Sequence, residues 1–126
     1  MDVSNQQDLS SWVLSCAEQS GGINVAVSNV SALLIDDTIQ NWTSTFNTGM
    51  LALVTLVKTS PPYLEKGKGS IIAISSVSGR DVDFTAPGPY GAFKASIVHC
   101  VPSSTCTYVG AEGGVGQDSV PGKHLY

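Results

Sequence analysis

The sequence predicts an α/β protein with an open parallel β-sheet covered by helices. Two largely apolar runs, 23–27 and 71–75, contain no charged residue and suit strands buried in a parallel sheet. Amphipathic helical patterns precede, separate and follow these runs, so the expected order is helix, strand, helix, strand, helix. In sheets of this kind a ligand binds beyond the carboxyl ends of the strands.

The first helix is expected to begin at a capping box, because Ser4 is followed three residues later by Gln7. Gly21-Gly22 is expected to end the helix, since glycine favours the left-handed conformation that follows many helices. The first strand, 23–27, comes next. Between these limits the apolar residues recur at helical spacing: Leu9, Trp12, Val13, Cys16 and Ala17.

A long second helix is predicted between the two strands. Asp36 or Asp37 is expected to cap its amino end, and Pro61-Pro62 to end it. Because amphipathic stripes usually serve packing, we expect its apolar face to lie in the core or at a subunit contact, not at a cofactor. The side chains of that face are Trp42, Phe46, Met50, Leu53, Val54 and Val57.

A third helix is predicted from about residue 88, after a loop rich in Gly, Pro and Asp. Pro102 is expected to interrupt it, because proline removes a main-chain donor from a helix interior. The run 103–107 is rich in Ser and Thr, which are poor helix formers, and Gly110, Gly113, Gly114 and Gly116 then weaken any strand. The last 25 or so residues are therefore expected to depart from the alternating pattern.

The composition argues against several classes of function. The 126 residues suit one domain, and the net charge of −4 leaves no basic patch for a nucleic-acid backbone. No apolar run approaches the roughly 20 residues of a membrane span. The amino end lacks the basic and apolar regions of a signal peptide. We therefore expect neither nucleic acid nor a membrane as a partner.

The three cysteines predict a cytoplasmic location. They show no C-x-x-C spacing, so they are interpreted as reduced thiols and not as a disulfide framework or a zinc site. His99 and His124 lack carboxylate or cysteine partners at useful spacing. We therefore expect no metal site.

The candidate chemistry lies between the second strand and the third helix. Ser75 and Ser76 end the strand, and alternation along it points their side chains to opposite sides. Tyr90 and Lys94 are four residues apart, which places them on one face of a helix. A phenol has an unperturbed pKa of about 10, and a nearby ammonium stabilises its ionised form. With a serine hydroxyl to hold an oxygen atom, this arrangement suits interconversion of a carbonyl and an alcohol.

The same residues carry a family resemblance. Ile74-Ser75-Ser76-Val77-Ser78-Gly79, followed by Tyr90-x-x-x-Lys94, resembles the short-chain dehydrogenase/reductase family. The segment 24–31 and Pro121-Gly122 fit that family in the same order. The resemblance implies a Rossmann-like doubly wound parallel sheet. It also implies a single partial domain over 1–126, in which 1–100 match well and 101–126 form a divergent tail.

The resemblance implies a role for each matching residue. Tyr90 would donate or accept the proton, Lys94 would assist it and bind the nicotinamide ribose, and Ser76 would position the substrate oxygen. The cofactor would be NAD or NADP and the substrate a small carbonyl or alcohol. The long helices would form a homo-oligomer. Cofactor-binding positions would be Asp2, at the adenine, with Asn29, Tyr90, Lys94, Pro121 and Gly122.

The sequence also departs from the family. No strand, glycine-rich turn and helix open the chain, so we expect Met1 to begin partway through the fold, with the first βαβ unit missing. An asparagine that the family often carries in the long helix corresponds, by counting from Trp42, to Gly49.

Two hypotheses follow. The first is an NAD(P)-dependent oxidoreductase that transfers hydride between the nicotinamide and a carbonyl or alcohol. The second is a catalytically inactive fragment that acts as an interaction or oligomerisation module. An exposed hydrophobic sheet edge would favour self-association of the chain.

Overall fold

The computed structural model describes residues 1–34, 36–64, 69–81, 84–85, 88–100 and 106–109. Pro102, Pro121 and Gly122 lie outside this part of the chain. The elements, in order, are α1 (Gln6–Ser20), β1 (Val25–Ser28), α2 (Ile39–Thr45), the π-helical segment η1 (Phe46–Leu51), α3 (Ala52–Thr59), α4 (Pro61–Leu64), β2 (Ser70–Ile74), the 3₁₀ turn η3 (Val77–Gly79), α5 (Pro89–Cys100) and β3 (Cys106–Val109).

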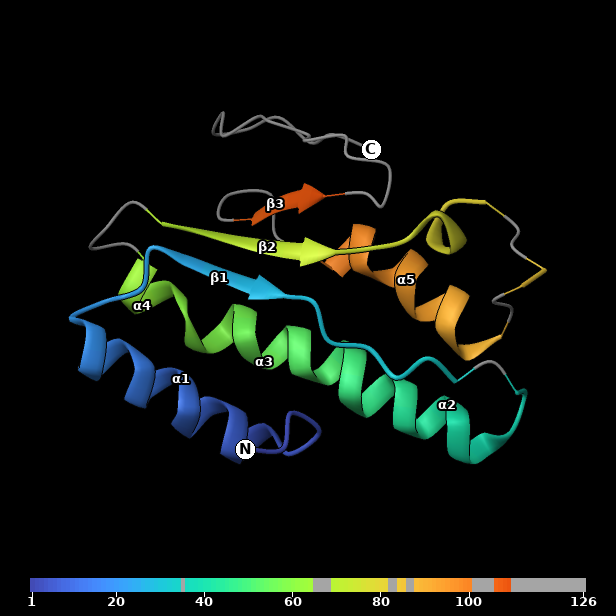
Figure 1. The fold of residues 1–126 in the computed structure, drawn as a ribbon, viewed down its shortest axis with the longest axis horizontal. Helices are drawn as coiled ribbons and strands as arrows, with labels where there is room; N and C mark the ends of the chain where they lie inside the picture. Colours follow the sequence, from blue (N-terminus) through green and yellow to red (C-terminus); the bar gives the residue numbers. More distant parts are fainter. Residues whose placement is uncertain (35, 65–68, 82–83, 86–87, 101–105, 110–126) are drawn as a thin grey trace.

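The strands form one parallel sheet in the order β1-β2-β3 (Figure 1). The alternating α/β architecture expected from the sequence is therefore confirmed. In the register of the first pair, Ala26 lies opposite Ile71 and Ser28 opposite Ala73. β3 pairs with β2 and adds a strand to the expected order, so the expectation that the last 25 or so residues depart from the alternating pattern is wrong for 106–109. β1 forms one edge of the described sheet.

Two expected helix caps are wrong by one residue. Asn5, not Ser4, caps α1, and its side chain accepts hydrogen bonds from the amides of Gln7 and Asp8. Thr38, not Asp36 or Asp37, caps α2 by accepting from the amide of Asn41. In both places two good capping residues are adjacent, and only one of them has its oxygen within reach of the free amides.

The carboxyl ends of the helices follow the sequence more closely. Gly21 ends α1 with a φ of 76°, the left-handed conformation that glycine adopts without strain. α3 ends at Thr59, just before the two prolines, and Pro61 then begins the short helix α4. α5 ends at Cys100.

The helices cover one face of the sheet, and the core lies between them and that face. One cluster joins α1, α3 and α4 to Ala26 and Ile71, and a second joins Leu53, Phe93 and Ile97 to Ala73. In Figure 1, α1 and α3 lie side by side beneath the strands. Within the part of the chain that the structure describes, no helix is both long and apolar enough to cross a membrane.

The opposite face of β1 is exposed. Val25 and Val27 keep 50% and 56% of their accessible surface, whereas Ala26 between them is buried. A strand of a doubly wound sheet is normally covered on both faces. This strand therefore has an apolar face, as well as an edge, that the described residues leave uncovered.

The apolar stripe of the long helix divides at the π-helical segment. Its carboxyl half enters the core, where Leu53 is 1% exposed, which confirms the packing role expected for that half. Its amino half is exposed, with Phe46 at 54% and Trp42 at 39%. The indole of Trp42 donates a hydrogen bond to Asp37 Oδ1 at 2.6 Å. The change from α to π geometry redirects the stripe, because a π turn takes more residues than an α turn.

Candidate active site

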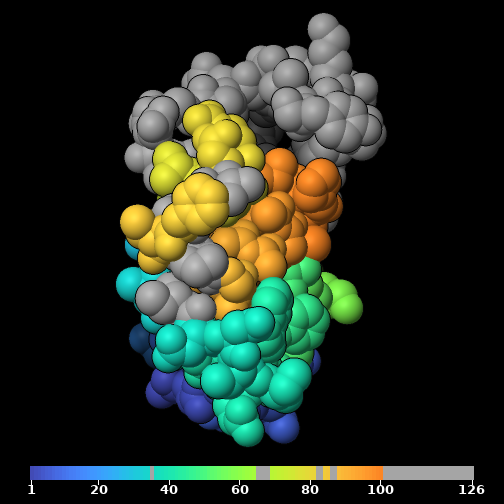
Figure 2. Space-filling model, turned by 90° about the vertical axis from the view of Figure 1, so that its right-hand side faces the viewer, coloured from blue at the N-terminus to red at the C-terminus, as the bar shows by residue number. Residues whose placement is uncertain are grey.

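Because β1 and β2 are parallel, their carboxyl ends lie at the same end of the sheet. Ser28, the last residue of β1, lies opposite Ala73, which is one residue before the end of β2 at Ile74. Ser75 and Ser76 follow directly. α5 begins beyond this edge and packs against η3. Figure 2 shows this side of the molecule, with α5 (orange) between α2 (teal) and the residues that follow β2 (yellow).

Lys94 is a buried lysine with a defined partner. Its side chain is 3% exposed, and Nζ donates a hydrogen bond to the carbonyl oxygen of Ile74 at 2.9 Å. Desolvation by burial lowers the pKa of Lys94 from its ordinary value of 10.5. The amine therefore lies at the carboxyl end of β2 and not in open solvent. This location differs from that of an ordinary surface lysine, which keeps its charge in water.

Tyr90 and Lys94 share a face of α5, as their spacing predicts. Nζ of Lys94 lies 5.7 Å from the centre of the Tyr90 ring and 5.3 Å from that of Phe93. Both distances are within the range of cation–π attraction. Tyr90 itself is half-buried.

Ser76 caps the turn that follows β2. Its hydroxyl accepts a hydrogen bond from the amide of Ser78 at 3.3 Å and donates one to the hydroxyl of Ser78 at 3.2 Å. A substrate oxygen would therefore compete with Ser78 for this hydroxyl. The capping arrangement is common for serine in a loop, and it holds Ser76 at the sheet edge beside the α5 face.

Ser75 has a contact that the sequence alone did not reveal. It is buried, and its hydroxyl donates a hydrogen bond to the main-chain carbonyl of Lys94 at 2.7 Å. Ser75 and Ser76 thus point to different partners, as strand alternation predicts. The only available sequence signal was the position of Ser75 on the strand, because its partner lies 19 residues further along the chain.

Two glycines allow close packing around α5. A Cβ at Gly79 would lie 2.5 Å from the carbonyl carbon of Lys94, and a Cβ at Gly49 would lie 2.5 Å from the ring of Phe93. Real Cβ atoms essentially never approach so closely, so both positions require glycine unless their neighbours move. At Gly49, where family counting places an asparagine, the Phe93 ring therefore fills the space of a side chain.

Two other residues predicted to bind the cofactor, Asp2 and Asn29, lie within the described part of the chain and form no hydrogen bond with Ser76, Tyr90 or Lys94. The carboxylate of Asp2 accepts hydrogen bonds from the amide and the hydroxyl of Ser4, and these bonds lower its pKa. Asn29 is exposed at the end of β1, on the same sheet edge as Ser76. Among the described residues, no cluster of three or more His, Cys, Asp or Glu could hold a metal ion.

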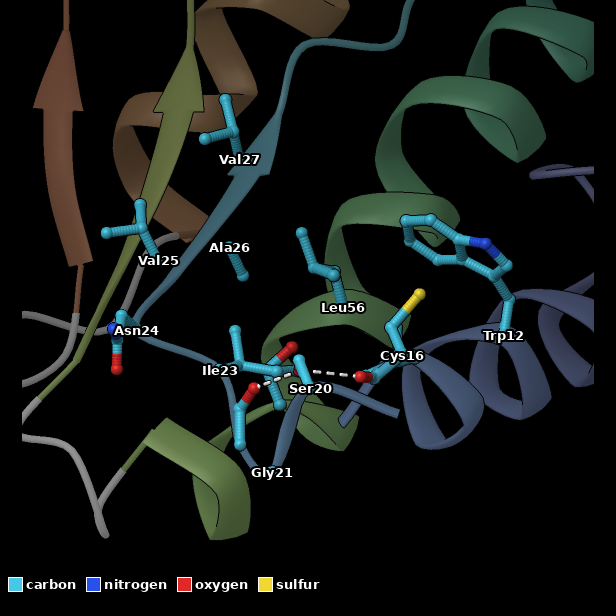
Figure 3. A pocket seen from close by; sticks show the side chains of 13 residues that line it. Trp12, Cys16, Ser20, Gly21, Ile23, Asn24, Val25, Ala26, Val27 and Leu56 are labelled. Carbon is cyan, nitrogen blue, oxygen red and sulfur yellow. Dashed lines mark hydrogen bonds between the residues drawn. The ribbon is translucent and has the colours of Figure 1, made fainter. Parts of the chain in front are cut away.

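A pocket among the described residues lies elsewhere. It has a volume of about 550 Å³ and runs along β1, between that strand and the carboxyl half of α1. Figure 3 shows Trp12 and Cys16 on one side of it and Val25 and Val27 on the other. This pocket lies along β1, the strand at the free side of the described sheet. It is therefore separate from Ser76, Tyr90 and Lys94, which lie at the carboxyl end of β2.

Comparison with known proteins identifies the family. A sequence model described as short chain dehydrogenase matches residues 1–112. The chain belongs to the short-chain dehydrogenase family. The segment 24–31 and the segment from Ile74 to Lys94 lie inside the matched range, whereas Pro121-Gly122 lies outside it.

Relatives of this short-chain dehydrogenase include two fungal proteins named isoepoxydon dehydrogenase patN. The protein from Penicillium expansum is 38% identical over 96 residues, which cover 75% of this chain and 37% of the relative. The protein from Aspergillus clavatus is 32% identical over 113 residues, covering 89% and 43%. The chain thus spans less than half the length of the curated relatives that it matches.

Solved structures confirm the Rossmann-like fold of the family. A 3-ketoacyl-ACP reductase from Sinorhizobium meliloti superposes with a TM-score of 0.73 at 23% identity, covering 87% of this chain and 49% of the other. ElxO with NADP bound superposes with a TM-score of 0.71 at 21% identity, covering 79% and 42%. The arrangement of β1, β2, α3 and α5 is therefore that of a short-chain dehydrogenase, in the incomplete form that the described sheet presents.

Proposed function

We propose that this chain carries the reaction centre of an NAD(P)-dependent oxidoreductase that interconverts a carbonyl and an alcohol. The observation that carries the proposal is the burial of Lys94 beside Tyr90, with its ammonium tethered to the last carbonyl of β2. Buried lysines are rare unless paired, and perturbed ones cluster at functional sites. Family membership and the names of the dehydrogenase relatives support the same reaction class.

The residues at the strand ends fit the ribose end of a nicotinamide dinucleotide. Among the described residues, the Lys94 ammonium donates to one protein acceptor, the carbonyl oxygen of Ile74, and a protonated lysine carries three donors. The exposed amide of Asn29 lies on the same sheet edge. Both groups can bind hydroxyl oxygens. A structural relative with NADP bound supports this class of cofactor. When bound, NAD or NADP supplies or accepts the hydride.

The chain's own residues would handle the proton and the substrate oxygen. In the reducing direction, Tyr90 Oη gives its proton to the oxygen that becomes the alcohol. In the oxidising direction it takes the proton back. The ammonium of Lys94 would stabilise the phenolate, which is formed in the reducing direction and consumed in the oxidising direction. Ser76 Oγ, turned from Ser78, would donate a hydrogen bond to the same oxygen and hold it near the phenol.

Turnover assays with a panel of ketones and aldehydes, and with NADH and NADPH in turn, test this function. We expect the wild-type chain to oxidise the reduced cofactor, and we expect Tyr90→Phe to lose roughly 100-fold or more of that rate. Tyr63→Phe is the matched control, because Tyr63 is half-buried in α4, away from the strand ends. A Tyr90→Phe variant as active as the wild type would contradict the proposal.

A second candidate function is an interaction module that binds another copy of the chain. The free edge of β1 and its exposed valines support this alternative, because unpaired strand edges are templates for pairing. The segment 23–28 contains none of the charged residues or prolines that usually protect an edge. A folded chain that binds neither dinucleotide but self-associates would favour this function over the first.

A further inference from the structure

We propose that Ser75 is a positioning residue, which fixes the turn of α5 that carries Tyr90 and Lys94 against the end of β2. The importance of this turn for catalysis rests on the function proposed above. The positioning itself is a property of the fold, and it can be measured without a cofactor or a substrate.

The first contact is the hydrogen bond from Ser75 Oγ to the carbonyl oxygen of Lys94, at 2.7 Å. Both residues are less than 5% exposed. Water therefore does not compete for this bond, and a bond in such surroundings is stronger than the same bond at the surface. Removing the hydroxyl would leave the end of the strand with one fewer link to the helix.

The second contact runs in the opposite direction between the same two elements. Lys94 Nζ donates to the carbonyl oxygen of Ile74, the residue before Ser75. Lys94 is thus held at its main chain by Ser75 and at its amine by Ile74. A shift of the α5 main chain would move the Cα atom of Lys94. Its amine could then keep the hydrogen bond to Ile74 only if the side chain were strained.

The third contact is made by η3 with the same peptide group, that of Lys94. Gly79 packs so near to Lys94 that a Cβ there would lie 2.6 Å from the carbonyl oxygen that Ser75 binds. The 3₁₀ turn and the serine thus meet at one peptide of the helix. Protein interiors packed this closely transmit small displacements to their neighbours. The position of the Tyr90 and Lys94 face therefore depends on the Ser75 bond.

Two other buried hydroxyl groups show that burial alone does not give a side chain a hydrogen bond like that of Ser75. Ser60 and Thr45 are at most 1% exposed, and neither hydroxyl has a hydrogen-bond partner among the residues that the structure describes. Ser60 therefore offers a matched control. Ser60→Ala and Ser75→Ala delete the same atom from equally buried sites, but only the second breaks a link to the site.

Trace acetylation of lysines, followed by mass spectrometry across a range of pH, measures how accessible and how basic Lys94 is. The exposed Lys58 in the same molecule serves as the internal reference. We expect Ser75→Ala to raise the acetylation rate of Lys94 about tenfold, which corresponds to the loss of one buried hydrogen bond. We expect Ser60→Ala to stay near the wild-type rate. An unchanged rate at Lys94 in folded Ser75→Ala would overturn the proposal.

Ser75→Cys provides a second variant in case the alanine variant fails to fold. The thiol has nearly the same volume and is a weaker donor. In this variant the acetylation rate of Lys94 is expected to lie between the rates in the wild type and in Ser75→Ala. If Ser75→Ala is unfolded, the rate in Ser75→Cys is expected to exceed that of the wild type. A rate equal to that of the wild type would count against positioning by Ser75.

Turnover separates this inference from the proposed function. If the wild type is active, Ser75→Ala should lower kcat about tenfold and change KM little, because the substrate-binding groups remain. If no variant turns over, wild type included, the proposed function fails. The acetylation result then still decides the role of Ser75, since faster labelling supports it and unchanged labelling contradicts it.

Discussion

The ammonium group of Lys94, a residue that is 3% exposed, donates a hydrogen bond to the carbonyl oxygen of Ile74 at 2.9 Å. This contact joins the carboxyl end of β2 to the middle of α5. It places a cation beside the Tyr90 ring at the edge where ligands of parallel α/β sheets bind. The predictions below start from this contact.

Replacing Lys94 should separate catalysis from stability. Lys94→Met keeps a long apolar stem but removes the charge, so any turnover should fall by roughly 100-fold or more because the phenolate loses its cation. The free energy of unfolding should fall by less than about 2 kcal/mol, or should increase, because the substitution removes the buried charge together with its hydrogen bond. Chemical denaturation and initial-rate assays measure the two effects. Lys58→Met is the control, and a loss of activity in that variant would show that the effect is not local.

The buried amine also predicts a pH dependence of stability. Burial lowers the pKa of Lys94 in the folded state below the 10.5 of a free lysine. Between these two values the unfolded chain binds more protons, so the free energy of unfolding should rise with pH. The penalty of the buried charge is fully present below the folded pKa and disappears as the pH approaches 10.5. Denaturant titrations of wild type and Lys94→Met should diverge over this alkaline range, and parallel curves would contradict a lowered pKa.

The close approach of Gly49 to Phe93 predicts a compensating pair of substitutions. Gly49→Ala should destabilise the fold by about 1–3 kcal/mol, because a Cβ there would lie 2.5 Å from the ring. Phe93→Leu alone should also destabilise it, through the loss of buried ring surface. Combined, the two changes should cost less than their sum, since the smaller leucine leaves room for the methyl group. Strict additivity in thermal unfolding would show that the ring does not occupy that space.

The exposed face of β1 predicts self-association of the chain. Val25 and Val27 present apolar side chains beside a free strand edge. Val27→Lys should reduce the mass measured by light scattering, because a charge on an edge strand opposes pairing. Leu33→Lys, at a residue that is 68% exposed but lies beyond the strand, should leave the mass unchanged. A wild-type chain that stays monomeric at high concentration would contradict this prediction.

Local pattern was enough to predict the central elements of the fold. β2 and α5 were predictable because an uncharged apolar run and a proline after a helix are signals carried by neighbouring residues. The caps were missed by one position because Ser4 and Asn5, like Asp37 and Thr38, are competing capping residues that only geometry separates. β3 was not predicted, although Thr107, Tyr108 and Val109 are residue types enriched in strands, because the strand is short and the residues around it are rich in Ser and Gly.

In the candidate site, too, features that depend on neighbouring residues were predictable and features that depend on distant contacts were not. The spacing of Tyr90 and Lys94 predicted their shared helix face, and the structure confirms it. The roles of Ser75 and Gly79 were not predictable, because each depends on a contact with a peptide 15 or more residues away. The π-helical segment was equally invisible, since a 3.6-residue pattern continues through it from Trp42 to Leu53.

Calorimetric titration of the folded chain with NADH and then with NADPH tests the central claim most directly. If Lys94 and Asn29 form the ribose end of a dinucleotide site, one of the two cofactors should bind saturably, and Lys94→Met should weaken that binding about tenfold or more by removing a charged hydrogen bond. Lys58→Met should bind as the wild type does. The absence of binding at millimolar concentrations of either cofactor, by a chain shown to be folded, would contradict the claim.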